Sequence, residues 1–493
     1  MEKLNKRSMK NKISAIYLIN FFIGFLCLPL FMLGQVTTFQ RWYQCSINQS
    51  GRDVLPISDG GYLIAATTET GIFDDIDVLI IKTNSFGDTL WSKSYGGDKP
   101  DYPNNMLQTS DGNFFLVGSS QSYGGGDQDV YLLKINPLGD TLWAKTYGGN
   151  GNEEGKEIVA TADGNYVIVG ASNSVNHSNN DALLMKIDPS GNVLWTKYYG
   201  GSTYESTRSV KLCLDGGFIL AGKTSSIVNA VASVFLVKTN ASGDTLWTKI
   251  YNGPDSYEGK SILANSDGTY TLCIDDSSGI HDSDVRWMKI NSTGTIIWNK
   301  SYGGNDKDIC KMIQPTNDNG YIIAGISRSF GWANPDMWLL KINSLGDTLW
   351  TRHYGGNGHE HCLAARPTAD GGFVTIGHTR SYSLNEEIML VKVDSIGRIL
   401  PVGVNEYAFN NTILTVYPNP TREIINVQLR GDMAPGSKLS VSDILGQELY
   451  SETIDRFCGT INKEVNLKEQ NPGIYFVTLR SNEICVTQKL VLN

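Results

Sequence analysis

The sequence predicts an all-β fold: a seven-bladed β-propeller closed by an N-terminal strand, followed by a small immunoglobulin-like (Ig-like) β-sandwich. Three observations lead to this prediction. A tryptophan motif recurs every 51 or 52 residues, each period contains four strand-like runs, and the repeat stops near residue 400. Four short antiparallel strands repeated at this spacing are the pattern of propeller blades.

The repeat is clearest in the peptide Gly-Asp-Thr-Leu-Trp and its variants, which end at Trp91, Trp143, Trp195, Trp247, Trp298 and Trp350. Trp42 lies 49 residues before Trp91 and is interpreted as the same position. In the third repeat, turn signals such as Asp163-Gly164 separate four strand-like runs, at 156–161, 165–171, 181–188 and 192–199. Glycine in these turns supplies the positive φ angle that tight hairpins require.

The seventh repeat predicts how the propeller closes. It contains three strand-like runs but has Pro401 where the other repeats have tryptophan, and proline cannot donate to a strand ladder. We therefore expect the N-terminal run 38–45, around Trp42, to complete the last blade as its outermost strand. Such closure would remove the exposed edges of an open array. The alternative is a sequential register, in which the Trp42 strand opens the first blade.

The repeat resembles the bacterial seven-bladed β-propeller repeat of the SBBP type, over residues 36–400. The resemblance is carried by the Asp-Gly turn, by Gly-x-x-x-Trp, by a glycine near the end of the second strand in five repeats, such as Gly170, and by a lysine in each third strand, such as Lys186. It implies the fold and says almost nothing about chemistry, because propellers host many activities.

The two ends of the chain predict export. Residues 1–34 combine a basic head, the apolar run Ile13–Leu33 and the small residue Gly34, which is the pattern of a signal peptide. The apolar run is also long enough for a single transmembrane anchor, which is the alternative. With a signal peptide, the chain would contact a membrane only during export. The propeller is then expected over 35–400 and a linker over 401–412.

Residues 413–493 form a different unit, which we expect to fold as a sandwich of about seven short strands. It contains Tyr417-Pro418-Asn419-Pro420, the turn Leu445-Gly446-Gln447, the strand Gly473–Val477 and the terminal run Lys489–Asn493. In this order the features resemble the C-terminal sorting domain of type IX (Por) secretion cargo. The resemblance implies that residues 413–493 engage the type IX secretion machinery and that the protein is secreted or held on the outer cell surface.

The sequence contains no motif of a known catalytic or cofactor site. There is no phosphate-binding glycine loop, nucleophile elbow, zinc-protease helix or calcium-binding loop. We therefore assign no catalytic residue and expect no cofactor. The net charge is −9 and no basic patch stands out, which argues against a nucleic-acid partner.

One set of acidic residues recurs with the repeat. A carboxylate follows successive tryptophans by ten or eleven residues, at Asp53, Asp101, Glu153, Glu205, Glu258, Asp308 and Glu360. Each precedes the first strand of a blade, so the seven could surround one mouth of the central channel and bind a cation or a basic ligand. The alternative, which a position repeated in every blade favours, is that each carboxylate accepts backbone N–H bonds and ties neighbouring blades together.

Two weaker candidates break the repeat pattern. His359 and His361 carry metal-ligand side chains and would share one face of a strand, but the spacing provides no fourth ligand. Trp332 lies in a predicted loop and is the best candidate for an exposed aromatic contact with a ligand.

Three hypotheses about function follow. The first, which the regular repeats favour, is an exported propeller that binds or scaffolds a glycan or protein. The second is an extracellular enzyme that degrades polysaccharide or peptide; this would require irregular residues from several blades to converge, and loops this regular favour binding over catalysis. The third is a purely structural component of adhesion or of a surface layer.

Overall fold

The computed structural model describes residues 37–43, 48–69, 76–174, 179–225, 232–252, 256–276, 284–330, 334–383, 385–399, 413–433, 437–444, 446–454, 457–480 and 485–493. The predicted signal peptide, the predicted linker and Trp332 lie outside these residues. Across this part of the chain, no helix has the length and apolar character that crossing a membrane would take.

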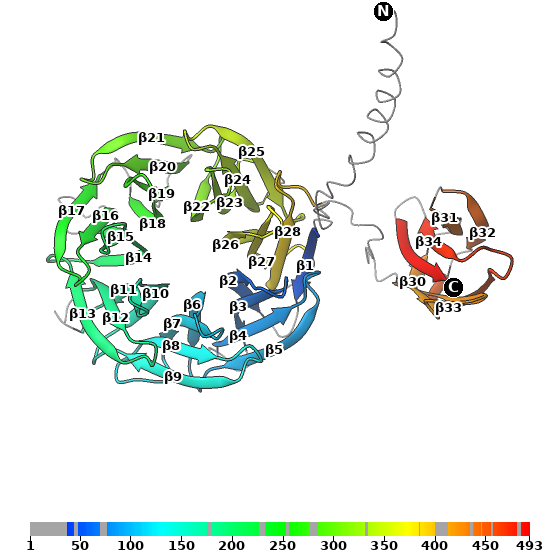
Figure 1. The fold of residues 1–493 in the computed structure, drawn as a ribbon, viewed down its shortest axis with the longest axis horizontal. Coiled ribbons are helices and arrows are strands. Elements are labelled where there is room, and N and C mark those ends of the chain that lie inside the picture. Colours follow the sequence, from blue (N-terminus) through cyan, green and yellow to red (C-terminus); the bar gives the residue numbers. More distant parts are fainter. Residues whose placement is uncertain are drawn as a thin grey trace, which may run out of the picture. The chain divides into compact units, whose positions relative to one another are not determined.

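The described residues up to 399 form seven four-stranded antiparallel sheets, which we number as blades 1 to 7. Figure 1 shows the blades arranged in a circle, with the first strand of each nearest the centre and the fourth at the periphery. The structure is therefore the all-β propeller that the repeat predicted.

Strand bounds follow the repeat closely. Blades 1 and 2 contain β2 (Gln49–Pro56), β3 (Tyr62–Glu69), β4 (Ile76–Thr83), β5 (Thr89–Tyr95), β6 (Asp101–Gln108), β7 (Phe114–Ser120), β8 (Asp129–Ile135) and β9 (Thr141–Tyr147). Blades 3 and 4 contain β10 (Glu153–Ala160), β11 (Tyr166–Ser172), β12 (Asp181–Ile187), β13 (Val193–Tyr199), β14 (Glu205–Leu212), β15 (Phe218–Thr224), β16 (Ser233–Thr239) and β17 (Thr245–Tyr251). Blades 5 and 6 contain β18 (Tyr257–Ala264), β19 (Tyr270–Asp276), β20 (Val285–Ile290), β21 (Ile296–Tyr302), β22 (Asp308–Pro315), β23 (Tyr321–Ser327), β24 (Asp336–Ile342) and β25 (Thr348–Tyr354). Blade 7 contains β26 (Glu360–Pro367), β27 (Phe373–Thr379), β28 (Glu387–Val393) and β1 (Phe39–Tyr43).

The N-terminal strand closes the propeller as expected, but in a different register. β1 pairs with β28 as the outermost strand of blade 7, and Phe39 lies opposite Lys392. In blade 1 the residue opposite the equivalent lysine, Lys82, is Trp91. Phe39 therefore occupies the repeat's tryptophan position, and the interpretation of Trp42 as that position is wrong by three residues. The outer position of the strand excludes the sequential register.

Hydrophobic cores lie between neighbouring blades. Each cluster of buried residues combines two adjacent sheets; Phe115 of β7, for example, packs with Tyr166 of β11 and Ile187 of β12. At the periphery, a tryptophan of one blade packs beneath a turn glycine of the next blade. A Cβ added to Gly191 would lie 2.7 Å from the ring of Trp143, so this close packing, as well as its φ of +77°, requires glycine.

The C-terminal residues 413–493 form two sheets around one hydrophobic core. One sheet has the order β29 (Ile413–Tyr417), β30 (Ile424–Met433), β33 (Phe457–Asn466); the other has the order β32 (Glu448–Ile454), β31 (Ser437–Asp443), β34 (Gly473–Arg480), β35 (Cys485–Leu492). The seven strands match the expected number. The fourth strand, β32, pairs with the third strand, β31, because the tight turn at Gly446 joins the two directly. In a constant-type immunoglobulin domain the fourth strand instead belongs to the sheet of the first two strands.

Candidate functional site

Five of the seven predicted carboxylates occupy one equivalent position, the first residue of the innermost strand. These are Asp101, Glu153, Glu205, Asp308 and Glu360. All five are buried. In blades 1 and 5 the equivalent residues are Gln49 and Tyr257. Like the acids, both lie opposite the end of the second strand of their blade: Tyr257 opposite its last residue and Gln49 opposite its penultimate residue. The expectation of one carboxylate in every blade therefore does not hold.

Hydrogen bonds within the blades explain the five carboxylates. Each accepts a bond of 2.8–3.1 Å from the backbone N–H of the second glycine in the preceding Gly-Gly pair. Each also accepts a bond of 2.5–2.8 Å from a serine or threonine hydroxyl of the same blade. These bonds hold the chain where it passes from one blade to the next, which supports the structural alternative for this position.

Asp53 and Glu258 lie elsewhere on their strands. Asp53 accepts two bonds of 2.9–3.0 Å from the guanidinium of Arg366 and one of 2.9 Å from the Asn105 side chain. It therefore joins blades 7, 1 and 2. Glu258 contacts Arg208 of blade 4 and Lys260 of its own strand. Burial raises the pKa of Glu258, but the two cations outweigh it and hold the value at about 2.

The histidines do not form a metal centre with four ligands. β26 begins at Glu360, so His359 precedes the strand and lies exposed. His361 packs instead against His378, with ring centroids 4.6 Å apart, and His378 Nδ1 lies 2.8 Å from the Ser50 hydroxyl. Among the residues that the structure describes, no three histidine, cysteine or acidic side chains are grouped closely enough to hold a metal ion.

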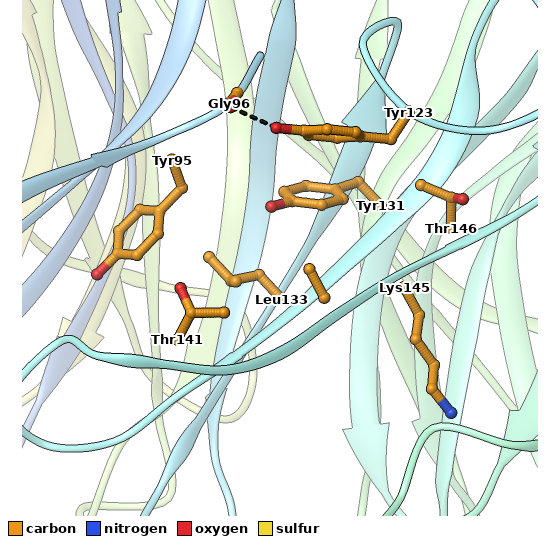
Figure 2. Close-up of a pocket in the computed structure, with 9 residues that line it drawn as sticks. Tyr95, Gly96, Tyr123, Tyr131, Leu133, Thr141, Lys145 and Thr146 are labelled. Atoms are coloured by element: carbon orange, nitrogen blue, oxygen red, sulfur yellow. Dashed lines mark hydrogen bonds between the residues drawn. The ribbon is translucent and has the colours of Figure 1, made fainter.

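A cavity of about 480 Å³ lies where blades 1 and 2 meet, and the sequence did not single it out. Figure 2 shows two tyrosine rings stacked at its wall, Tyr123 from the loop after β7 and Tyr131 from β8. Their centroids are 6.1 Å apart with an interplanar angle of 26°. Tyr131 is buried, whereas Tyr123 is 45% exposed, so one aromatic face is open to solvent.

Hydrogen bonds hold part of this wall in place. The Tyr123 hydroxyl donates to the Gly96 carbonyl over 2.5 Å, and the Tyr95 hydroxyl donates to the Gly139 carbonyl, also over 2.5 Å. Burial raises the pKa of Tyr95 to about 12 and also raises that of Tyr131, so both phenols are protonated at neutral pH. Tyr131, although buried, also lines the cavity.

The remaining lining residues combine apolar and hydroxyl groups. Leu133 and Ala144 contribute apolar surface, and Thr141 and Thr146 contribute hydroxyls. Lys145 also lines the cavity, but its ammonium group donates to the Ser190 carbonyl over 2.7 Å and extends away from the tyrosines (Figure 2). The cavity can therefore offer a flat aromatic face and neutral hydrogen-bonding groups, and it contains no nucleophile paired with a base.

Comparison with known proteins identifies the C-terminal unit. Residues 415–493 match the model of the secretion system C-terminal sorting domain. The chain is 22% identical over 165 residues to the regulatory protein FlaEY of Caulobacter vibrioides, a match that covers 28% of this chain and 17% of that protein.

Solved structures are similar to this chain at low sequence identity. The β-propeller domain of the Trilobed protease from Pyrococcus furiosus has 7% identity and a TM-score of 0.41, over 73% of this chain and 100% of that one. The acylaminoacyl peptidase of Pyrococcus horikoshii has 9% identity and a TM-score of 0.42, over 78% of this chain and 57% of that one. The repeated four-stranded sheets and the matched C-terminal domain together show a β-propeller-type repeat protein with a type IX secretion sorting domain; this domain implies an interaction with the type IX machinery and indicates secretion or attachment to the outer cell surface.

Proposed function

We propose that the exported propeller is a binding module for a glycan, and that the glycan lies against Tyr123 in the cavity between blades 1 and 2. The observation that carries the proposal is the stacked pair Tyr123 and Tyr131, with one exposed face beside a cavity of about 480 Å³. This volume is within the range of small-ligand sites, roughly 300–1,000 Å³.

The chemistry of the cavity suits a neutral sugar. A pyranose has one apolar face of C–H groups, which packs on an aromatic ring, and a rim of hydroxyls, which require donors and acceptors. Tyrosine provides both, an apolar ring and a hydroxyl. Thr141, Thr146 and the Tyr131 hydroxyl provide further hydrogen-bonding groups. The cavity is open and partly exposed, which fits a unit within a longer saccharide chain.

Export supports the same function. A sorting domain delivers this protein to the outer surface or the medium, where glycans are abundant. We further propose that residues 1–34 act as the signal peptide for the first step of export.

The test is binding of the purified protein to a glycan array, followed by calorimetry with the best glycan. Tyr123→Ala removes the exposed aromatic face and is expected to weaken binding about tenfold, since an aromatic contact contributes roughly 0.5–1.5 kcal/mol beyond its buried area. Tyr123→Phe keeps the ring and is expected to bind within about twofold of the wild type.

Leu142→Ala is the matched control, because Leu142 is equally exposed and lies on β9 outside the cavity lining. Absence of glycan binding, or equal binding by Tyr123→Ala and Leu142→Ala, would contradict the proposal. Retained binding together with cleavage of the bound polysaccharide would favour the enzyme hypothesis instead.

A further inference from the structure

The innermost strands share an irregularity that places one residue of each outside the ladder. In all seven blades the register between first and second strands shifts at the same point and skips one residue. A bulge of this kind turns the extra side chain away from the ladder. The skipped residues are Arg52, Asn104, Lys156, Arg208, Lys260, Lys311 and Leu363.

Five of these seven residues are basic. They come from blades 1, 3, 4, 5 and 6, and all five are on the strands that lie nearest the centre of the circle (Figure 1). We call Arg52, Lys156, Arg208, Lys260 and Lys311 the central cation cluster. In the sequence, each of these five basic residues stands three positions after the first residue of its inner strand.

A contact between blades brings two of these side chains, Arg208 and Lys260, to one carboxylate. Arg208 of blade 4 reaches across to Glu258 of blade 5, which also contacts Lys260. Lys260 Nζ lies 3.4 Å from Asp275 Oδ2 of β19. Lys156 contacts Glu154 of its own strand. All these groups are largely buried, apart from the half-exposed Arg208 and Glu154.

The cations outnumber their partners. Three carboxylates, Glu154, Glu258 and Asp275, contact the cluster, and these contacts involve three of its five members. Lys311 has no ion pair with any described residue, and the buried Nε of Arg52 donates to no described group. Other nearby carboxylates are already bonded: Asp53 to Arg366, and Glu157 to Lys211.

The protonation equilibria reflect this excess of positive charge. Burial, followed by the neighbouring charge of Arg208, lowers the pKa of Lys156 to about 7. Burial and the charge of Lys260 lower the pKa of Lys311 as well. Burial also lowers the pKa of Arg52. Burial and neighbouring cations therefore destabilise the charged forms of Lys156 and Lys311, and burial destabilises that of Arg52; an added negative charge would stabilise all three.

We propose that the central cation cluster binds an oxyanion, a phosphate, sulfate or carboxylate group, which completes the charge balance of the cluster at the centre of the propeller. This is a second site, separate from the glycan cavity between blades 1 and 2. The oxyanion is either a free small anion or the acidic group of a sugar. Charge-assisted N–H···O⁻ bonds from lysine and arginine suit all three groups.

Thermal unfolding of the purified exported protein in inorganic phosphate, sulfate or glucuronate, each compared with chloride at equal ionic strength, tests the proposal. The expected result is a rise in Tm that increases with anion concentration, because a ligand that binds only the folded state stabilises it. Phosphate or sulfate acting more strongly than glucuronate would identify a free small anion, and the reverse order an acidic sugar. Equal curves in all four salts would overturn the proposal.

Lys311→Met separates binding from folding. Without added anion, its Tm is expected to rise, since one buried like charge is removed. With phosphate, its apparent affinity is expected to fall about tenfold, the loss of one charge-assisted bond. Lys197→Met removes a partly exposed lysine of β13, whose surface ion pair with Asp244 contributes little to stability, and is expected to change neither value appreciably. A lower Tm for Lys311→Met with an undiminished phosphate effect would mean that the lysine is structural and would overturn the proposal.

Discussion

At the blade junctions, two carboxylates lie close to one glycine. The first glycine of a junction lies between two of them: a Cβ added to Gly148 would be 1.7 Å from Asp129 Oδ1 and 2.3 Å from Glu153 Oε2. Where the aspartate of the third strand is replaced by Ser233, the acid of the next blade is replaced by Tyr257. At the junction from blade 7 to blade 1, however, Glu387 is retained although Gln49 replaces the acid, so the two positions change together at one junction and not at the other.

At the same scale, His378 makes stability depend on pH. Burial is the main cause that lowers its pKa to about 4; the charges of His361, Arg52 and Arg380 act in the same direction and that of Glu386 opposes them. The unfolded chain binds its proton near the ordinary value of about 6.5, so the folded state binds fewer protons between about pH 4 and 6.5. The contribution of His378 to the free energy of unfolding is therefore fully present above pH 6.5 and is lost as pH falls toward 4.

The variant that tests this is His378→Gln. Wild-type protein is expected to lose more thermal stability than the variant between pH 7 and pH 4, by about 2–3 kcal/mol at most. Measurement of Tm at half-unit intervals of pH checks the difference. Parallel curves for the two proteins would contradict the assignment, and His359→Gln, at an exposed position, controls for charge removal.

At the scale of the element, the 52-residue repeat extends to the N-terminal strand. Phe39 precedes Trp91 by 52 residues, and Tyr43 then matches Tyr95. The two tyrosines make the same bond: the Tyr43 hydroxyl donates to the Gly87 carbonyl over 2.7 Å, as that of Tyr95 does to Gly139. Alignment of Trp42 instead of Phe39 with Trp91 shifts the first repeat by three residues. This shift accounts for the wrong interpretation of Trp42 and for the grouping of Asp53 with the blade carboxylates.

This register makes opposite predictions for two aromatic residues of β1. Phe39 is 6% exposed and packs against Tyr62 and Gly87, so Phe39→Ala is expected to destabilise the propeller by about 3–5 kcal/mol. Trp42 is 45% exposed and stacks on Tyr382 at the surface, so Trp42→Ala is expected to cost roughly 1 kcal/mol. Denaturant unfolding of both variants checks the order. A larger loss for Trp42→Ala would mean that Trp42 occupies the core position.

At the scale of the whole molecule, closure of the propeller uses a strand near the N-terminus, whereas the sorting domain lies at the C-terminus. β1 pairs with β28 and so supplies the outermost strand of blade 7, which gives this blade four strands like the others. The C-terminal sandwich has its own core and its own sheets. A domain of this kind can be removed without taking a strand from the propeller.

Mass spectrometry of the protein from culture supernatant and from outer membrane tests this processing. We expect a chain that begins near Gln35 and ends within 401–412, because both cleavages would leave all seven blades complete. A chain inside the cell that retains Met1 and Asn493 would contradict both export steps. Loss of residues beyond Phe39 would contradict the role of β1 in closure.

The repeat by itself determined the strand pattern, the turn glycines and the closing strand, because these depend on local periodicity and on which strand is missing. The C-terminal motifs determined the route of export. Tertiary structure decided the function of each repeated side chain. Equal spacing in sequence could not reveal that Tyr257 takes the carboxylate position, or that a bulge turns Lys156 out of the ladder. Tyr123 and Tyr131 likewise line a cavity only because two blades meet beside them. Such sites depend on contacts between blades, and the repeat encodes each blade alone.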